Sequence, residues 1–142
     1  TAKIVCKNKK ISTNNYLMEI DYGNAEGLNL TELNQKYPEI LKSWKKGMDP
    51  NFPKGESLKN VSDRLNNFIK NKLISKKNLN YLIFTHNVLL RCLIGNIYKI
   101  SKKEWFKIDI KYFDLLEFRL ENNRLISNID RGKYLSIFKN FY

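Results

Sequence analysis

The chain has 142 residues, and its content of 42% hydrophobic and 13% aromatic residues excludes a disordered protein and suits a single domain. Lysine and arginine outnumber the acidic residues 26 to 14, which gives a formal net charge of +12 and an isoelectric point near 9.7. The excess is almost entirely lysine, scattered in pairs such as Lys9-Lys10 and Lys102-Lys103, so we expect weak attraction to polyanions but no specific nucleic-acid partner.

The sequence carries no sign of a membrane or secretory protein. No apolar run is long enough to span a bilayer, and the first residues lack the layout of a signal peptide. We therefore expect a cytoplasmic protein with no membrane partner. Cys6 and Cys92 lie far apart without metal-ligand spacing, so we expect free, buried thiols in place of a disulfide. The sequence leaves the oligomeric state open, a homo-oligomer included.

The first half of the chain is predicted to be mainly helical, because apolar residues recur at spacings of three and four. In chain order we expect the end of a helix over 1–7, an extended stretch over 16–20, helix over 30–46 with a fresh start at Pro38, a loop over 47–55, and a helix from a Ser57 cap to about Ile74.

The second half is predicted to mix strands and helices. In chain order we expect a buried strand over 80–85, a helix over 88–96, a brief helix after Ser101 that holds Trp105 and Phe106, and a hairpin with arms over 114–120 and 124–129 about the Asn122-Asn123 turn. No internal repeat or linker to a second domain is visible.

His86 is the first candidate for chemistry, because it is the only histidine and it directly follows the predicted buried strand. Ligands of open α/β sheets bind beyond the carboxyl ends of the strands. A helix is predicted to start within a residue or two, and helix amino termini favour bound anions such as phosphate. The alternative is a histidine that only bonds a loop carbonyl.

Three segments, in order, resemble the histidine phosphatase superfamily with its phosphoglycerate mutase-like fold. Residues 17–27 are similar to the stretch around the catalytic glutamate of that family, residues 52–57 followed by Asp63-Arg64 resemble its Gly-Glu-Ser helix start, and residues 84–87 match its second active-site histidine. The resemblance implies one α/β domain over residues 1–142, with three layers and a mostly parallel central sheet. That domain is incomplete, because its first strands are missing from these residues.

The chain departs from the family at its signature, because no Arg-His pair occurs among the 142 residues. By resemblance, the histidine that attacks phosphorus lies outside this chain, on a strand that neighbours residues 80–85. Without that strand, two interior strands would keep unpaired backbone groups, each costing about 1 to 3 kcal/mol when buried. We therefore expect a longer natural chain or a second polypeptide, and genuine loss of the segment is the third option.

The resemblance also assigns roles to individual residues. His86 would stabilise the transferring phosphoryl group as a hydrogen-bond donor, and Glu19 would be the general acid that protonates the leaving oxygen and then activates water. Lys54 and Arg91 match residues that touch substrate in the sugar-bisphosphatase branch, and the Asn87 amide is a candidate for a substrate hydroxyl. Each of these side chains has a plain alternative as solvated surface, and Glu56 is better explained by pairing with Arg64.

Together these observations predict a phosphatase that acts on a small phosphorylated metabolite through a phosphohistidine, without metal or other cofactor. This chain alone is then expected to be inactive, because it lacks the nucleophile. The compact link between the Glu19 motif and Gly55 favours a phosphatase over a phosphoglycerate mutase, which is the alternative activity. A non-catalytic relative that binds phosphorylated ligands is the rival of another class.

Overall fold

The computed structural model describes residues 1–75 and 79–127. Its elements, in chain order, are α1 (Ala2–Cys6), η1 (Asn15–Leu17), η2 (Gly23–Ala25), α2 (Leu30–Lys36), α3 (Pro38–Lys45), α4 (Leu58–Phe68), η3 (Ile69–Ile74), α5 (Asn87–Ile97), η4 (Lys102–Lys107), β1 (Phe118–Glu121) and β2 (Arg124–Ser127). None of the helices described is long and apolar enough to cross a bilayer.

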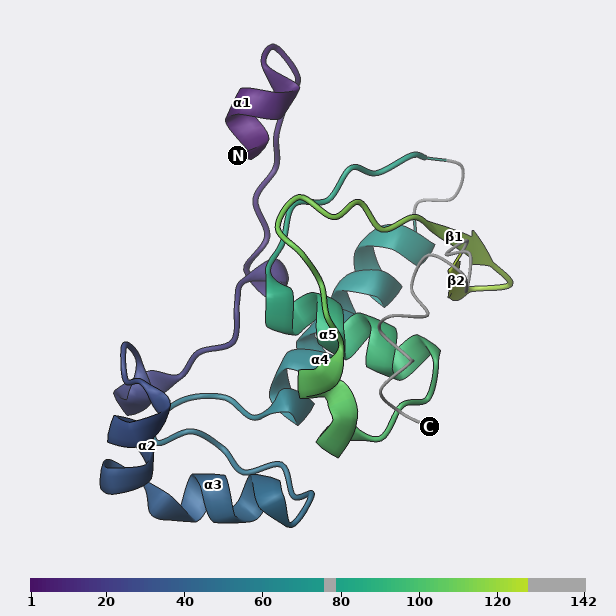
Figure 1. Cartoon of the computed structure of the whole chain (residues 1–142). Coiled ribbons are helices and arrows are strands. Elements are labelled where there is room, and N and C mark those ends of the chain that lie inside the picture. The colour runs from purple at the N-terminus through teal and green to yellow at the C-terminus, as the bar shows by residue number, and fades with distance from the viewer. Residues whose placement is uncertain (76–78, 128–142) are drawn as a thin grey trace.

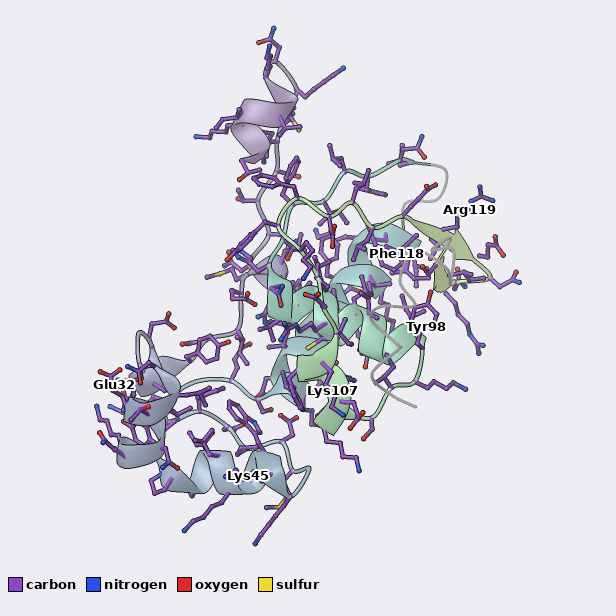
Figure 2. All side chains as sticks on the ribbon, viewed as in Figure 1. Glu32, Lys45, Tyr98, Lys107, Phe118 and Arg119 are labelled. Carbon is purple, nitrogen blue, oxygen red and sulfur yellow. The ribbon has the colours of Figure 1, made fainter. Side chains whose placement is uncertain are left out.

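Helices α4 and α5 form the centre of the molecule (Figure 1). Helices α2 and α3 lie to one side of this pair, and the β1-β2 hairpin lies to the other. Helix α1 stands apart, and its side chains project away from the remaining structure (Figure 2). It contributes no buried residue, so the packing that positions the candidate site comes from the segments that follow it.

Proline and capping residues set the helix boundaries as the sequence predicts. The expected restart at Pro38 is confirmed, because α2 ends at Lys36 and Pro38 is the first residue of α3. Ser57 caps α4, and its hydroxyl accepts from the Asn60 amide. The helix continues beyond Phe68 as the wider turn η3, so the predicted end near Ile74 is also confirmed.

The interface between α4 and α5 is the main part of the core. Val61 and Leu65 of α4 are buried together with Leu89 of α5. Two hydrogen bonds cross this apolar contact, from the Asn96 amide to the Ser62 hydroxyl at 2.8 Å and from the Cys92 thiol to the Leu58 carbonyl at 4.0 Å. Cys92 is fully buried in the same interface, and burial is the largest cause that raises the pKa of its thiol to about 12.

Both cysteines are free thiols, as predicted, but only Cys92 is buried. Cys6 is partly exposed because it belongs to the isolated helix α1. The expectation of two buried thiols is therefore wrong for Cys6.

The predicted buried strand over 80–85 is absent. Residues 79–86 run extended before α5 (Figure 1), but they pair with no strand in the part of the chain that the structure describes. Tyr81, Leu82 and Ile83 are 43%, 60% and 38% exposed. A strand needs a neighbour to form its ladder, and the two strands described, β1 and β2, pair with each other.

The short extended stretch expected over 16–20 is also shorter than predicted. Asn14 caps the tight turn η1, and its side chain accepts from the Tyr16 amide at 2.9 Å. Only the residues after Leu17 leave this turn in extended conformation. Met18 is exposed while Ile20 is buried, so the two neighbours of Glu19 lie in different environments.

The last described elements agree with the sequence, except that the first hairpin arm begins at Phe118 and not at Asp114. Trp105 is buried in η4 and donates to the Ile100 carbonyl at 2.9 Å, whereas Phe106 is exposed. The β1-β2 hairpin is antiparallel, and its two turn residues, Asn122 and Asn123, have positive φ as a tight hairpin turn requires. The expected second arm reached Ile129, which lies outside the described residues.

Candidate functional site

His86 occupies the N-cap position of α5. Its backbone is extended, its side chain makes no capping bond, and the residue is exposed. The predicted junction of an extended segment with a helix at His86 is therefore confirmed, although the preceding segment is not a strand. An imidazole at this position lies beside the first amides of an 11-residue helix, where a negative charge is favoured.

The Glu19 carboxylate lies at the same helix start. One of its oxygens accepts from the Val88 amide at 3.4 Å, and the other accepts from the Ile20 amide at 3.0 Å. Val88 belongs to the first turn of α5, so the fold brings Glu19 next to the helix that His86 caps. Two candidate residues that lie 67 positions apart in the sequence thus share one corner of the structure.

Tyr22 belongs to this corner as well, and the sequence reasoning missed it. Burial is the main cause that raises the pKa of the Tyr22 phenol, and the negative charges of Glu19 and Glu26 raise it further. Arg91 acts in the opposite direction. Tyr22 follows Glu19 by three residues in the same motif, and this short spacing was the signal that could have identified it.

Arg91 lies on α5 near Tyr22 and Glu19. The residue is partly buried, and its Nε atom is buried without a hydrogen-bond partner among the residues the structure describes. A buried donor without a partner is costly. Its guanidinium is therefore available to an acceptor that enters this corner.

Lys54 is held by two interlocked loops. The Asn24 amide donates to the Pro53 carbonyl at 2.8 Å, and the Glu56 amide donates to the Asp21 carbonyl at 2.8 Å. Gly23 has a φ of +53°, and a Cβ at this position would collide with the Pro53 carbonyl oxygen. Lys54 itself has a φ of +57° and an exposed side chain, and no described hydrogen bond joins it to Glu19 or His86.

The Asn87 side chain forms a hydrogen bond within the protein. Its side-chain amide donates to the Ile110 carbonyl at 3.1 Å, which ties the start of α5 to the segment after η4. One of the two N–H donors of this amide is thus paired, and its second N–H and its oxygen remain for a ligand.

The predicted pairing of Glu56 with Arg64 is confirmed. Arg64 Nε donates to Glu56 Oε1 at 2.8 Å, and Arg64 Nη2 donates to Glu56 Oε2 at 3.1 Å. The two side chains are only 14% and 23% exposed, so the pair is partly shielded from water. Glu56 Oε2 also accepts from the Asp21 amide at 3.0 Å.

A cavity of about 410 Å³ opens beside Tyr22. Tyr22, Trp44 and Phe52 line it, and the rings of Tyr22 and Trp44 each meet Phe52 edge-on, at centroid distances of 4.8 and 5.3 Å. Within residues 1–75 and 79–127, no three side chains of the histidine, cysteine or acidic types gather closely enough to hold a metal ion.

A histidine and a carboxylate thus lie at one helix start, with an arginine on the next turn. The sequence model of the histidine phosphatase superfamily (branch 1) matches residues 1–128, and the chain belongs to this superfamily.

Individual relatives include both mutases and a phosphatase. The chain is 33% identical over 103 residues to a 2,3-bisphosphoglycerate-dependent phosphoglycerate mutase of Cytophaga hutchinsonii, which covers 70% of this chain and 48% of that protein. It is 28% identical over 88 residues to phosphoserine phosphatase 1 of Hydrogenobacter thermophilus, covering 61% of this chain and 42% of the relative. The chain thus spans about half the length of these relatives.

A solved structure shares the fold. The chain superposes on YhfR of Bacillus stearothermophilus with a TM-score of 0.77 at 19% identity, covering 91% of this chain and 66% of that one. The architecture of the described residues is therefore that of a histidine phosphatase fold.

Proposed function

We propose that this chain is part of an enzyme that removes phosphate from a small phosphorylated metabolite through a phosphohistidine intermediate. The nucleophilic histidine lies outside these 142 residues, so the chain alone is inactive. The observation that carries the proposal is the Glu19 carboxylate against the Val88 amide, at the start of the helix that His86 caps. An acid and a hydrogen-bond donor then meet at one anion-binding position.

In the first step the attacking histidine forms a P–N bond while the bond from phosphorus to the substrate oxygen breaks. His86, as a donor, stabilises the charge that develops on the phosphoryl oxygens. Glu19 gives its proton to the leaving oxygen, which departs as an alcohol. A bound phosphate dianion favours the protonated form of a neighbouring carboxyl, so substrate binding itself prepares Glu19 for this step.

In the second step a water molecule attacks phosphorus. Glu19, now ionised, takes a proton from that water while the P–N bond breaks. Inorganic phosphate leaves, and both the histidine and Glu19 return to their starting forms. Two single displacements thus replace one direct hydrolysis, and one carboxyl serves both as acid and as base.

Lys54 and Arg91 are the proposed substrate-binding cations. The buried, unpartnered Nε of Arg91 supports a role in holding a second anionic or polar group of the substrate. Lys54 is exposed on the loop joined to residues 21–24, so it would reach a ligand from the solvent side. Asn87 would bind a substrate hydroxyl through its amide oxygen or its second N–H, because only one N–H is paired with Ile110.

We further propose that residues 80–85 form an interior strand of a three-layer domain with a mostly parallel sheet. The exposed apolar side chains of Tyr81, Leu82 and Ile83 support this proposal, because they would be buried if a further strand paired beside them. That strand would come from a segment outside these residues. The complete domain is proposed to act in the cytoplasm without metal, membrane or specific nucleic-acid partners.

Phosphoglycerate mutase activity is the second candidate, because relatives of that name are up to 33% identical to this chain. The compact link between Glu19 and Gly55 favours hydrolysis. A non-catalytic phospho-ligand-binding protein is the remaining alternative.

The test begins with the native protein. Its intact mass and amino-terminal sequence show whether further residues or a second polypeptide accompany the 142 residues. Incubation with a phosphomonoester should then leave acid-labile phosphate on the protein, and a His86→Asn variant should turn over at least about a hundredfold more slowly. Phosphate transferred between substrate positions would indicate the mutase. A natural start at Thr1 with no histidine-bearing partner would refute the proposed enzyme.

A further inference from the structure

Residues 18–22 carry Glu19 but belong to no helix or strand. Backbone in such a segment has no ladder to fix it, so side chains from neighbouring elements must hold its carbonyls and amides. The placement of the Glu19 carboxylate at α5 therefore depends on whichever groups bind this piece of backbone.

Arg64 of α4 supplies the bond at Glu19 and a second bond at Tyr16, just before this segment. Its Nη2 donates to the carbonyl of Glu19 itself at 3.0 Å, and its Nη1 donates to the Tyr16 carbonyl at 2.8 Å. The remaining donors bind Glu56, as described above. One guanidinium thus ties the carbonyls of Tyr16 and Glu19 to α4. A planar fork of five donors can do this, and a lysine ammonium cannot do it in the same geometry.

Arg64 and Glu56 together clamp this segment, and Glu56 binds its backbone at Asp21, on the other side of Ile20 from Glu19. The Glu56 carboxylate accepts from the Asp21 amide at 3.0 Å, and its own amide donates to the Asp21 carbonyl at 2.8 Å. The backbone is consequently fixed at Glu19 and at Asp21. Ile20 between them is buried, so the Glu19 side chain has little freedom except toward the first turn of α5.

We propose that Arg64 is the positioning residue for Glu19: its bond to the Glu19 carbonyl, braced by Glu56, sets the carboxylate against the Val88 amide. The catalytic meaning of that position rests on the proposed function. The donors of Arg64 bind Glu56 and backbone carbonyls, so Arg64 itself takes no part in the chemistry. A displacement of about 1 Å at a reacting group is enough to cost up to about a hundredfold in rate.

The first experiment measures position and needs no activity. In the native protein, Glu19→Gln should move the Val88 amide signal in nuclear magnetic resonance, because that amide loses its charged acceptor. The Ile20 amide, which binds the other carboxylate oxygen, reports the loss of the charge itself. In an Arg64→Gln background the Val88 shift caused by Glu19→Gln should fall by at least half while the Ile20 shift remains, and an Arg64→Lys background should restore part of it.

Lys59→Gln is the matched control, because it breaks the exposed Lys59–Asp63 pair on the same helix and leaves the clamp intact. An unchanged Val88 response in a folded Arg64→Gln protein would overturn the proposal. If that variant does not fold, Glu56→Gln decides by the same measurement, since it keeps an oxygen for the Asp21 amide but removes the charge that braces Arg64.

The second experiment separates this inference from the proposed function. In the native enzyme Arg64→Gln should lower kcat about tenfold or more with KM within about twofold, because substrate binding does not involve Arg64. Loss of the Val88 response in a protein that has no phosphatase activity would support the positioning and reject the proposed function. Unchanged kcat and an unchanged Val88 response in an active enzyme would reject the positioning alone.

Discussion

The Thr85 hydroxyl donates a hydrogen bond of 2.8 Å to the Leu17 carbonyl, across 68 positions of sequence. Thr85 directly precedes His86, and Leu17 lies two residues before Glu19. This one bond therefore joins the segment that leads into α5 to the segment that carries the proposed acid. The distance between the two candidate catalytic residues depends on it.

Thr85→Val should destabilise the protein by about 1 kcal/mol, because the Leu17 carbonyl loses its partner in a partly buried position. Thr31→Val makes the same chemical change at an exposed site on α2 and should cost much less. Urea unfolding of both variants measures the difference. Equal midpoints for the two would show that the Thr85–Leu17 bond contributes nothing.

Glu19→Gln should slow turnover of the native enzyme by at least about a hundredfold, because an amide neither donates the proton to the leaving oxygen nor accepts one from water. KM should change little, since the side chain keeps its shape. Glu39→Gln, an exposed carboxylate in the first turn of α3, serves as the control. Steady-state kinetics on one phosphomonoester make the comparison, and an undiminished rate in Glu19→Gln removes this residue from the mechanism.

Tyr22 should ionise above the ordinary pKa of 10.0, because burial and the nearby charges of Glu19 and Glu26 raise its pKa. A raised pKa favours the neutral phenol in the folded state. The associated stability is thus complete below the ordinary value near 10, and it is lost as the pH climbs through the folded value.

Tyrosinate absorbance during an alkaline titration follows this ionisation directly. Tyr22→Phe should remove the part of the absorbance change that comes from Tyr22. Glu19→Gln should move that part to lower pH, because the negative neighbour is gone. An identical titration curve for Glu19→Gln would mean that the two side chains do not interact.

Gly23→Ala and Gly27→Ala form a matched pair. Both glycines have positive φ, but an added Cβ at Gly23 would strike the Pro53 carbonyl whereas Gly27 faces open space. Both variants carry the strain of an alanine at positive φ. The difference between their unfolding free energies therefore measures how tightly the loop of Gly23 packs against the loop of Pro53. We expect Gly23→Ala to be about 1 to 3 kcal/mol less stable than Gly27→Ala in urea unfolding. Similar stabilities would show that the loops separate readily.

The helical parts of this fold were predictable because their signals are local. Pro38 and Ser57 mark helix starts through geometry that involves only a few neighbouring residues. The start of α5 at His86 follows from the same kind of signal. The candidate site was visible to the extent that a motif placed Glu19 and His86 in one family pattern.

What the sequence could not supply depends on distant partners. Residues 80–85 have the composition of a buried strand, yet a strand exists only when another segment pairs with it. The same holds for Tyr22, whose environment is made by Glu19 before it, Arg91 far beyond it and the burial of its ring. The use of Asn87 as a tie to Ile110 was equally invisible, because nothing local distinguishes a structural amide from one that binds a ligand.

Because Cys92 is buried between α4 and α5, its alkylation rate reports how often these two helices separate. A thiol whose pKa is raised to about 12 is almost entirely protonated at neutral pH, so alkylating reagents act on Cys92 only when the two helices part. Cys6, on the detached first helix, is within reach at all times and provides the reference. Once Cys6 is alkylated, the rate of alkylation at Cys92 therefore measures how often the α4–α5 pair beneath the candidate site opens.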